Sequence, residues 1–562
     1  MRWAFAIALL GAGVGCGDDA DPDVGERDAG VSTLPAATMP PPPVFPDRLG
    51  TLSVVVRTAD VEGADTDDPI EICLRDDLCI PLTMRQEDPF ERGQVDVFHV
   101  EVDRARSELD QVRLRGGEDA WRPECLELRF DGEPVYCEDA IDTEVGEWRD
   151  PAGLHQACST CQRGVLTFGP VQGVHDATRA RVWVRTDASR RVGLRMSETG
   201  DVEAGPIVAW AVPSPDDDFT ATLEVGGLEP GRAYDFRIEI DDFVGATHTL
   251  ATPAPTRPSV ELAFGSCSLH LAQPIFGTIL DADPDAFVFL GDAHYGDAAF
   301  LETHRWRFRR FRNVPERAAL FAEVPVLATW DDHDFTGNNS DVTCLGVEDA
   351  LRAWREWWGS PAYGTSEVSG VFFRHRDGPV DVFVLDCRTH RPFIDDPRRY
   401  CIANPDATST PIEDGILGPG QEAWLLAELQ RSDAPFKLLV CGSQWTAQGT
   451  LDSWASFVPA RDRLFDRIDA AGIEGVVLVS GDIHRSSIRR IARPRYDLVE
   501  LTTSPLAAER GECESDDELV ACWDETDAYL WIRADTETLR AEIRDVAGVA
   551  RHAVDLRADA LR

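Results

Sequence analysis

Four short apolar runs in the second half of the chain are each followed directly by side chains that can carry chemistry. The runs span four or five residues, a length and composition typical of strands buried on both faces. They occupy residues 260–264, 287–290, 326–329 and 476–479. Ligands in open α/β sheets bind outside the carboxyl ends of the strands. We therefore expect the residues that follow the four runs to share one rim.

From residue 257 onward, strands alternate with patterns that predict helices. The predicted helices cover residues 303–322, 346–358, 419–431 and 459–471. This alternation predicts an α/β domain at residues 257–562, in which a β-sheet sandwich is covered by helices and the strand-end loops lie on one side.

Two regions before residue 257 have a different pattern. Short alternating strands separated by turn clusters occur at residues 49–150 and again at residues 160–256. Regularly spaced short strands of this kind predict β-sandwiches. The chain is therefore expected to have two N-terminal β-sandwich domains followed by the α/β domain.

The first 16 residues indicate export. Arg2 precedes an apolar run at residues 3–14 that is too short to span a membrane. The run leads to Cys16, and the segment resembles a bacterial lipoprotein signal, in which the cysteine becomes the lipidated first residue. The resemblance implies a lipid-anchored protein of the cell envelope, facing the periplasm or the outer surface. An ordinary secretory signal is the alternative. Residues 17–48, rich in Asp, Ala and Pro, predict a disordered tether.

The charge of the chain limits its partners. Its 562 residues include 100 acidic and 55 basic residues, which gives a net charge of −45. Proteins that bind nucleic acid through the phosphate backbone need a basic footprint. We therefore expect no nucleic-acid-binding surface, and we expect a monomer.

The 14 cysteines of an exported chain are expected to be mostly paired. Some lie close together in sequence, whereas others have no near neighbour. The short spacings predict the bridges Cys73–Cys79, Cys125–Cys137 and Cys513–Cys522, and no pairing can be assigned to Cys344, Cys387, Cys401 and Cys441.

Three residues after the apolar runs suit a site with two metal ions. A pair of ions about 3.5–4 Å apart clamps the oxygens of a phosphate ester and activates a water. Such a site needs a bridging carboxylate, and Asp292 is the natural candidate. Asp482 and His484 are two positions apart, so their side chains share one side of an extended segment.

Further residues indicate which ions the site would take. Tyr295, as phenolate, is a hard anionic ligand suited to a trivalent ion such as Fe(III), although a packing role is the alternative. Cys267, as thiolate, would complete that site, although a disulfide is the alternative for an exported chain. The carboxylates of WDDHD at residues 330–334, with Asn338 or Asn339, would hold the second ion.

Several motifs occur in order between residues 165 and 506. They are FGSCS, LGDAHYGD, PVLATWDDHDFTGNN, FVLDCRTHR, ILGPGQEAWLLAEL, SGDIH and LTTSPL. Together they resemble the PhoD-type alkaline phosphatases of the binuclear metallophosphoesterase superfamily. Residues 49–150 are similar to the PLAT family of β-sandwiches. LEVGGLEPGRAYDFRI resembles a corner of a fibronectin type III domain, which implies that residues 160–256 form the N-terminal domain of a PhoD-type protein.

The resemblance implies a site with one iron (Fe3+) and a second divalent ion, often calcium. His333 would donate a proton or stabilise the phosphate. Arg388 would contact the phosphate, unless it forms a structural ion pair with Asp386. The implied ligands are Cys267, Asp292, Tyr295, Asp482 and His484 for iron, and Asp292, either Asp331 or Asp332, and Asn338 for the second ion.

These features predict a metal-dependent phosphoesterase that hydrolyses phosphate mono- or diesters at the cell envelope through a metal-bound hydroxide. Its partners would be a small or lipid-linked phosphoester and the membrane that holds the anchor. The alternatives are a phospholipase-like diesterase and a non-catalytic surface adhesin with a degenerate hydrolase domain. The preference among monoesters, diesters and phospholipids stays open.

Overall fold

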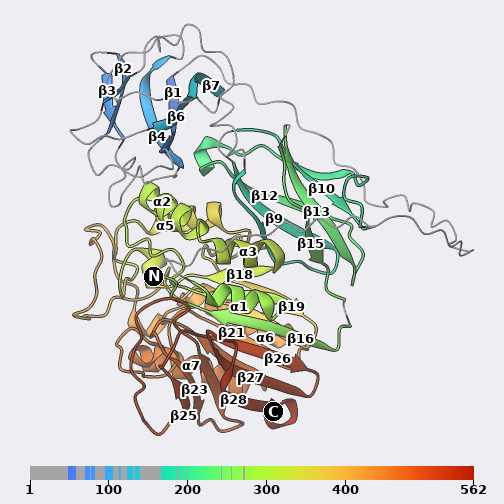
Figure 1. Ribbon diagram of the computed structural model, residues 1–562. Helices are drawn as coiled ribbons and strands as arrows, with labels where there is room; N and C mark the ends of the chain where they lie inside the picture. The colour runs from blue at the N-terminus through green and yellow to red at the C-terminus, as the bar shows by residue number, and fades with distance from the viewer. Residues whose placement is uncertain are drawn as a thin grey trace, which may run out of the picture.

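The computed structural model describes strands of the first region and most of the chain from residue 166 onward (Figure 1). The predicted signal at residues 1–16 and tether at residues 17–48 lie outside the described residues. The described residues are 49–58, 70–75, 78–82, 95–105, 113–115, 123–130, 133–139 and 166–562, the last with gaps at 187–188, 199, 242, 255 and 270–272.

The described strands of the first region form two antiparallel sheets, β4-β1-β6-β7 and β3-β2-β5. Cys73 is disulfide-bonded, and the register of β2 and β3 places Cys79 opposite it. The PLAT-like assignment and the bridge Cys125–Cys137 stay predictions. The strands are β1 (Leu49–Thr58), β2 (Glu71–Arg75), β3 (Leu78–Pro81), β4 (Val95–Ala105), β5 (Arg113–Arg115), β6 (Pro123–Phe130) and β7 (Glu133–Asp139).

The second region also has two antiparallel sheets, β12-β9-β8 and β11-β10-β13-β14, with β15 paired to β13. Both sheets contribute to one buried apolar cluster. The Tyr234 hydroxyl accepts a hydrogen bond from the Glu229 N–H at 2.8 Å, the type of contact that fixes a tyrosine corner. The fibronectin type III-like assignment stays a prediction. The strands are β8 (Leu166–Gln172), β9 (Arg179–Thr186), β10 (Val192–Ser197), β11 (Ile207–Ala211), β12 (Thr220–Gly226), β13 (Ala233–Ile240), β14 (Phe243–Val244) and β15 (His248–Ala251).

The rest of the chain forms two mixed sheets, ordered β18-β17-β16-β26-β27-β28 and β19-β20-β21-β22-β24-β23-β25. Neighbouring strands are parallel from β16 to β18 and from β20 through β21 and β22 to β24. The strands are β16 (Ser259–Gly265), β17 (Ala286–Leu290), β18 (Val326–Thr329), β19 (Phe373–Asp377), β20 (Val380–Val384), β21 (Phe436–Val440), β22 (Val476–Ser480), β23 (Ser486–Ile491), β24 (Leu498–Thr502), β25 (Leu519–Trp523), β26 (Ala528–Asp535), β27 (Thr538–Asp545) and β28 (Ala550–Arg557).

The continuous apolar runs are explained by burial on both faces of each sheet. In β17, Val288 and Leu290 join a core shared with the second sheet, whereas Phe287 and Phe289 join a core shared with helices. Alternate residues of a strand point to opposite faces, so a strand covered on both sides must be apolar throughout. The two sheets therefore stack on each other and helices cover their outer faces (Figure 1).

One predicted helix is wrong in its extent. Residues 303–322 form two helices, separated at Asn313 and Val314. Pro315 has no backbone N–H and keeps the preceding residue out of the helical region, so it ends one helix and begins the next. The helices are α1 (Ile275–Asp281), α2 (Leu301–Arg312), α3 (Pro315–Glu323), α4 (Asp332–Phe335), α5 (Val347–Trp357), α6 (Gly418–Arg431) and α7 (Val458–Ala470).

The second region is fixed to the α/β domain by buried polar contacts. The indole of Trp183 in β9 donates a hydrogen bond to the Glu356 carbonyl at 2.8 Å. The amide of Gln172 in β8 donates to the Ala322 carbonyl at 2.7 Å. Because both side chains are buried, each of these hydrogen bonds would cost stability if it were broken. Among the described residues, no helix has the length and apolar character needed to cross a bilayer.

Three disulfides occur in the described part of the α/β domain. The predicted bridge Cys513–Cys522 is confirmed. The cysteines that the sequence left unassigned pair as Cys344–Cys401 and Cys387–Cys441. Cys267 is buried and free, which leaves its sulfur available as a ligand.

Candidate metal centre

The loops after four strands meet at one rim of the stacked sheets. Cys267 follows β16, Asp292 follows β17, Asp332 follows β18, and Asp482 and His484 follow β22. These residues form overlapping groups whose potential ligand atoms lie within 4.8 Å of one another. The rim predicted from the four apolar runs is therefore present. The groups are Cys267 with Asp292 and His484, Asp292 with Asp332 and His333, and Asp331 with Asp332 and Asp482.

All five residues predicted for the first ion have backbones in the left-handed region. Their φ angles are between 47° and 73°. Non-glycine residues pay a steric cost there, and such strain concentrates at functional sites. The five residues are Cys267 (60°), Asp292 (56°), Tyr295 (47°), Asp482 (73°) and His484 (56°).

Several buried oxygens of the rim have no hydrogen-bond partner within the protein. They include Asp292 Oδ1, the Tyr295 hydroxyl and Asp331 Oδ2. A buried polar atom without a partner costs about 1–3 kcal/mol. Three such oxygens at one place are therefore suited to binding cations.

The carboxylates of the rim are held close together away from water. Burial raises the pKa of Asp292 well above its usual value, and the nearby Cys267 and Asp332 raise it further. Burial likewise raises the pKa of Asp482 to about 7, with a further contribution from Asp332. Burial raises the pKa of the Cys267 thiol to about 12. Cations at this rim would stabilise the deprotonated groups, because metal binding and ligand deprotonation are coupled.

Asp331 and Asp332 are adjacent but have different partners. Asp331 Oδ1 accepts hydrogen bonds from Arg388 at 2.5 Å and Ser443 at 3.2 Å. Asp332 accepts the backbone N–H groups of His333 at 2.9 Å and Asn339 at 2.6 Å. Burial alone would raise the pKa of Asp332, but the charges of His333 and Arg388 and the two N–H groups hold it below its usual value. These contacts stabilise the deprotonated form of Asp332.

His333 is oriented by an acidic partner. Its Nδ1 lies 2.7 Å from Oδ1 of Asp297, and the Asp297 N–H donates to the His333 carbonyl. Burial lowers the pKa of His333, but Asp332 and Asp297 outweigh it and raise the pKa to about 10. The imidazolium is therefore the favoured form in the protein alone. Its ring packs against Tyr295, with the ring centroids 4.7 Å apart.

Asp334 connects the loop after β17 with α4. One of its oxygens accepts the N–H groups of Ala293 and His294 at 2.9 and 3.0 Å, and the His294 Nδ1 lies 2.8 Å away. The other oxygen accepts the N–H of Asp331 at 3.3 Å, which forms a capping box at the start of α4. His294 also lies 3.1 Å from a ring nitrogen of His304. This buried network fixes the loop that carries Asp292 and Tyr295.

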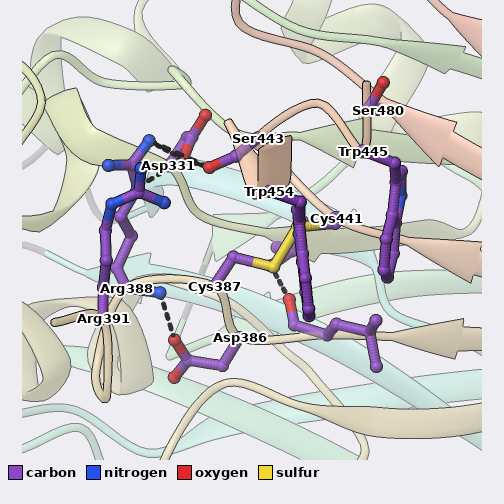
Figure 2. The surroundings of a disulfide bond; sticks show 12 residues. Asp331, Asp386, Cys387, Arg388, Arg391, Cys441, Ser443, Trp445, Trp454 and Ser480 are labelled. Carbon is purple, nitrogen blue, oxygen red and sulfur yellow. Dashed lines mark hydrogen bonds and ion pairs between the residues drawn. A yellow bond between two sulfur atoms is a disulfide. The ribbon is translucent and has the colours of Figure 1, made fainter. Parts of the chain in front are cut away.

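Arg388 is fully buried and bound on several sides (Figure 2). Besides Asp331, its guanidinium donates to both oxygens of Asp452, at 3.1 and 2.5 Å, and to the Ser443 hydroxyl at 3.1 Å. The carboxylate of Asp386 instead accepts the backbone N–H of Arg388 at 3.0 Å. The ion-pair partners of Arg388 are thus Asp331 and Asp452, and the alternative of an ion pair with Asp386 is not observed. A phosphate contact by Arg388 stays a prediction.

A disulfide braces this part of the rim. Cys387 precedes Arg388 after β20, Cys441 precedes Gly442 and Ser443 after β21, and the two sulfurs are bonded (Figure 2). The neighbouring Gly442 leaves room for Asp331, because a Cβ at this glycine would lie only 2.5 Å from the Asp331 Cγ. The disulfide therefore joins the two loops that hold Asp331.

The amide groups of the two predicted asparagine ligands donate hydrogen bonds within the protein. Asn338 donates its side-chain N–H to the Arg398 carbonyl at 2.8 Å, and Asn339 donates its own to Asp396 at 2.6 Å. Each amide oxygen remains chemically able to bind a cation. The assignment of Asn338 as a ligand of the second ion stays a prediction.

Sequence reasoning missed residues whose role depends on partners far along the chain. They include Asp297 and Gln444, whose amide donates to Asp482 Oδ2 at 2.6 Å. Gln444 lies in the loop that follows β21, so its position near a strand end was an available signal. Asp297 belongs to the motif GDAHYGD, where only other members had been assigned. Asp334 was expected among the ligands of the second ion, and the structure shows it hydrogen-bonded to the loop after β17.

Two stacked sheets with covering helices and ligands at the strand ends define the metallophosphoesterase fold of PhoD and purple acid phosphatases. Within that class, the chain belongs to the PhoD-like phosphatase family, whose model matches residues 262–549. A second model, described as a domain of unknown function (DUF7800), matches residues 163–257.

Known proteins agree with this assignment. The alkaline phosphatase D of Bacillus subtilis (strain 168) is 26% identical over 318 residues, which cover 47% of this chain and 53% of the relative. The match thus spans about half the length of that curated relative. A solved PhoD structure is similar with a TM-score of 0.57 and 19% identity over 71% of this chain and 92% of that one. Purple acid phosphatase PPD1 from yellow lupin (Lupinus luteus) seeds has a TM-score of 0.54 and 10% identity, covering 91% and 90%.

Proposed function

We propose that this protein is a metal-dependent phosphoesterase that hydrolyses phosphate mono- or diesters at the bacterial cell envelope. The observation that carries the proposal is the position of Asp292, which belongs to two neighbouring groups of metal-capable residues. A carboxylate with this position can bridge two ions, and two-ion sites are suited to phosphoester chemistry. Membership of the PhoD-like phosphatase family supports the same reaction class.

The donor set supports two different ions. Thiolate, phenolate, imidazole and carboxylate together suit iron, whereas carboxylate and amide oxygens suit a hard ion such as calcium. The unpartnered oxygens of Asp292 and Tyr295 fit this assignment, because each still lacks a contact. The proposed ligands are Cys267, Asp292, Tyr295, Asp482 and His484 for Fe3+, and Asp292, Asp332 and Asn338 for the second ion.

When bound, the two ions would supply an activated water and charge stabilisation for the phosphoryl oxygens. The residues of the chain supply proton transfer and orientation. His333 lies next to Asp292 and Asp332 and would protonate the leaving oxygen, as a general acid does. Asp297 keeps the His333 ring in place through the contact at Nδ1. Arg388 and Ser443 bind Asp331 and so fix its carboxylate beside Asp332 and Asp482.

Metal removal tests the proposal and separates it from a non-catalytic adhesin. The purified protein should hydrolyse bis(4-nitrophenyl) phosphate or 4-nitrophenyl phosphate, lose the activity with a chelator, and regain it when iron and calcium are added back. A protein that binds no metal and turns over neither ester under any of these conditions would contradict the proposal and favour the non-catalytic alternative. A panel that adds phospholipids to the two aryl esters tests the phospholipase-like alternative.

Anchoring at the envelope rests on the N-terminal sequence. Cys16 would carry lipid, and stable anchoring takes more than one acyl chain. The disulfides of the described residues fit a protein exported to an oxidising compartment. Wild-type protein should therefore enter the detergent phase on phase separation and Cys16→Ser should not, and equal partitioning of the two would contradict the anchor.

A further inference from the structure

A cavity of about 480 Å³ lies beside the metal centre, between α2, α3 and the loop after β17. Its wall includes Tyr295, a proposed iron ligand, and three arginines, Arg307, Arg310 and Arg317. No Asp or Glu belongs to the described lining. In a chain with 100 acidic and only 55 basic residues, a cavity of this composition is a local exception.

Arg317 is the most enclosed of the three arginines. Its side chain is buried, and its guanidinium lies 3.7 Å from the centre of the Phe311 ring. One nitrogen donates to Gln273 at 2.8 Å and another contacts the Ser268 hydroxyl at 3.4 Å, whereas Nε has no partner. No ion pair to Arg317 occurs among the described residues. Burying a cation is costly, so burial lowers the pKa of Arg317 well below its usual value; the charge of Arg312 lowers it further, and Glu316 acts in the opposite direction.

The side chains of the three arginines that line the cavity differ in their exposure to solvent. Arg317 is buried, Arg307 is half-buried and Arg310 is exposed. Burial lowers the pKa of Arg307, and the charge of Asp297, the partner of His333, acts in the opposite direction. Arg307 is thus the arginine of the cavity that is influenced by the partner of the proposed proton donor.

We propose that this cavity binds a second anionic group of the substrate, carried by the ester group next to the scissile phosphate. The inference rests on the proposed phosphoesterase function, because Tyr295 belongs to both the cavity and the metal centre. Guanidinium groups bind carboxylate and phosphoryl oxygens through strong, charge-assisted hydrogen bonds. A neutral ester group would leave Arg317 unpaired, so the site selects esters with an additional negative charge.

Two diesters with the same leaving group test the proposal. Phenyl 4-nitrophenyl phosphate and 3-carboxyphenyl 4-nitrophenyl phosphate both release 4-nitrophenolate and differ in one carboxylate. The metal-loaded wild type should hydrolyse the carboxylate diester with a kcat/KM on the order of tenfold higher, the effect of a charge-assisted hydrogen bond. Equal values for the two diesters would overturn the inference and leave the proposed function intact. Hydrolysis of neither diester would contradict both.

Arginine variants identify the source of the preference. Arg317→Gln and Arg310→Gln should lower kcat/KM more for the carboxylate diester than for the phenyl diester, so that their ratio falls toward one. Arg533→Gln is the matched control, because Arg533 is an exposed arginine of β26 outside the cavity lining. If Arg317→Gln fails to fold, the exposed Arg310 still provides the test. A ratio unchanged in Arg310→Gln, or lowered equally in the control, would overturn the proposal.

Benzoate provides a readout that does not require turnover. It should raise the melting temperature of the wild type, have less effect on Arg310→Gln, and inhibit the carboxylate diester competitively. Benzoate that stabilises the protein without any preference between the two diesters would indicate a site for free anions only, and would overturn the substrate assignment. The absence of both stabilisation and competition would also contradict it.

Discussion

Asp292 after β17 and Asp386 after β20 occupy equivalent positions, each two residues beyond a fully buried strand. The two carboxylates differ in how many hydrogen-bond donors surround them. Asp386 accepts hydrogen bonds from the Trp330 indole and from the backbone N–H of Val371, at 2.9 and 3.0 Å, and three more from Arg388 and Thr389.

Asp292 has no comparable set of donors. Its Oδ1 is buried without a partner, and its Oδ2 is approached by the Cys267 sulfur at 3.4 Å. A carboxylate that is already satisfied by the protein stabilises the fold, whereas an unsatisfied one is available to a cation. The strand-end position alone therefore does not identify a ligand, whereas an unsatisfied carboxylate oxygen at that position does.

The largest effect is expected at Asp292. Asp292→Asn keeps the shape but removes the charge that would bridge the ions, so kcat/KM for bis(4-nitrophenyl) phosphate should fall by at least about 10³-fold. Metal content, measured by elemental analysis, should fall with it. Asp395→Asn is the control, because Asp395 is exposed. Turnover of Asp292→Asn equal to that of the control would refute a two-ion site.

Tyr295→Phe should have an intermediate effect, because it removes one ligand of one ion. A phenolate bound to Fe(III) gives a visible charge-transfer colour, so the wild type should be coloured and the variant bleached. Iron affinity should fall by at least the ~10–100-fold that loss of a supporting residue costs at a metal site. A visible spectrum and elemental analysis measure both. A colourless, iron-free and active wild type would rule out this role for Tyr295.

The smallest effect on chemistry and a clear effect on stability are expected at Asp386. Asp386→Asn replaces an acceptor oxygen by an N–H2 group that faces other donors, which should lower the free energy of unfolding by about 1–3 kcal/mol. Urea unfolding measures it, again with Asp395→Asn as the control, which should stay within about 0.5 kcal/mol of wild type. Loss of iron without loss of stability in Asp386→Asn would reverse the distinction between the two aspartates.

The sequence predicted the sheets and the rim because the signal was local. A run such as residues 287–290 is apolar at every position, which only burial on both faces explains, and the chemical residues follow it directly. The break between α2 and α3 was equally local, since Pro315 is visible in the sequence. It was overlooked because the apolar spacing continues across it.

The roles of the remaining residues depend on contacts between distant segments. Arg388 follows its strand as the metal-capable residues do, yet its partners lie 57 and 64 positions away, at Asp331 and Asp452. His333 and Asp297 are 36 positions apart. No periodicity or spacing relates such pairs, so the partners of Arg388 and His333 became visible only with the fold.

The disulfide Cys387–Cys441 also affects how this protein should be produced. It links the loops that carry Arg388 and Ser443, and both of these hold Asp331. A reducing cytosol keeps cysteines as free thiols, whereas an oxidising compartment lets them form disulfides. In material expressed in the cytosol, the two loops that hold Asp331 would therefore not be linked. Its metal affinities would be lower than those of the exported protein. Recombinant work on this chain should secrete it or refold it under oxidising conditions before any ion is titrated.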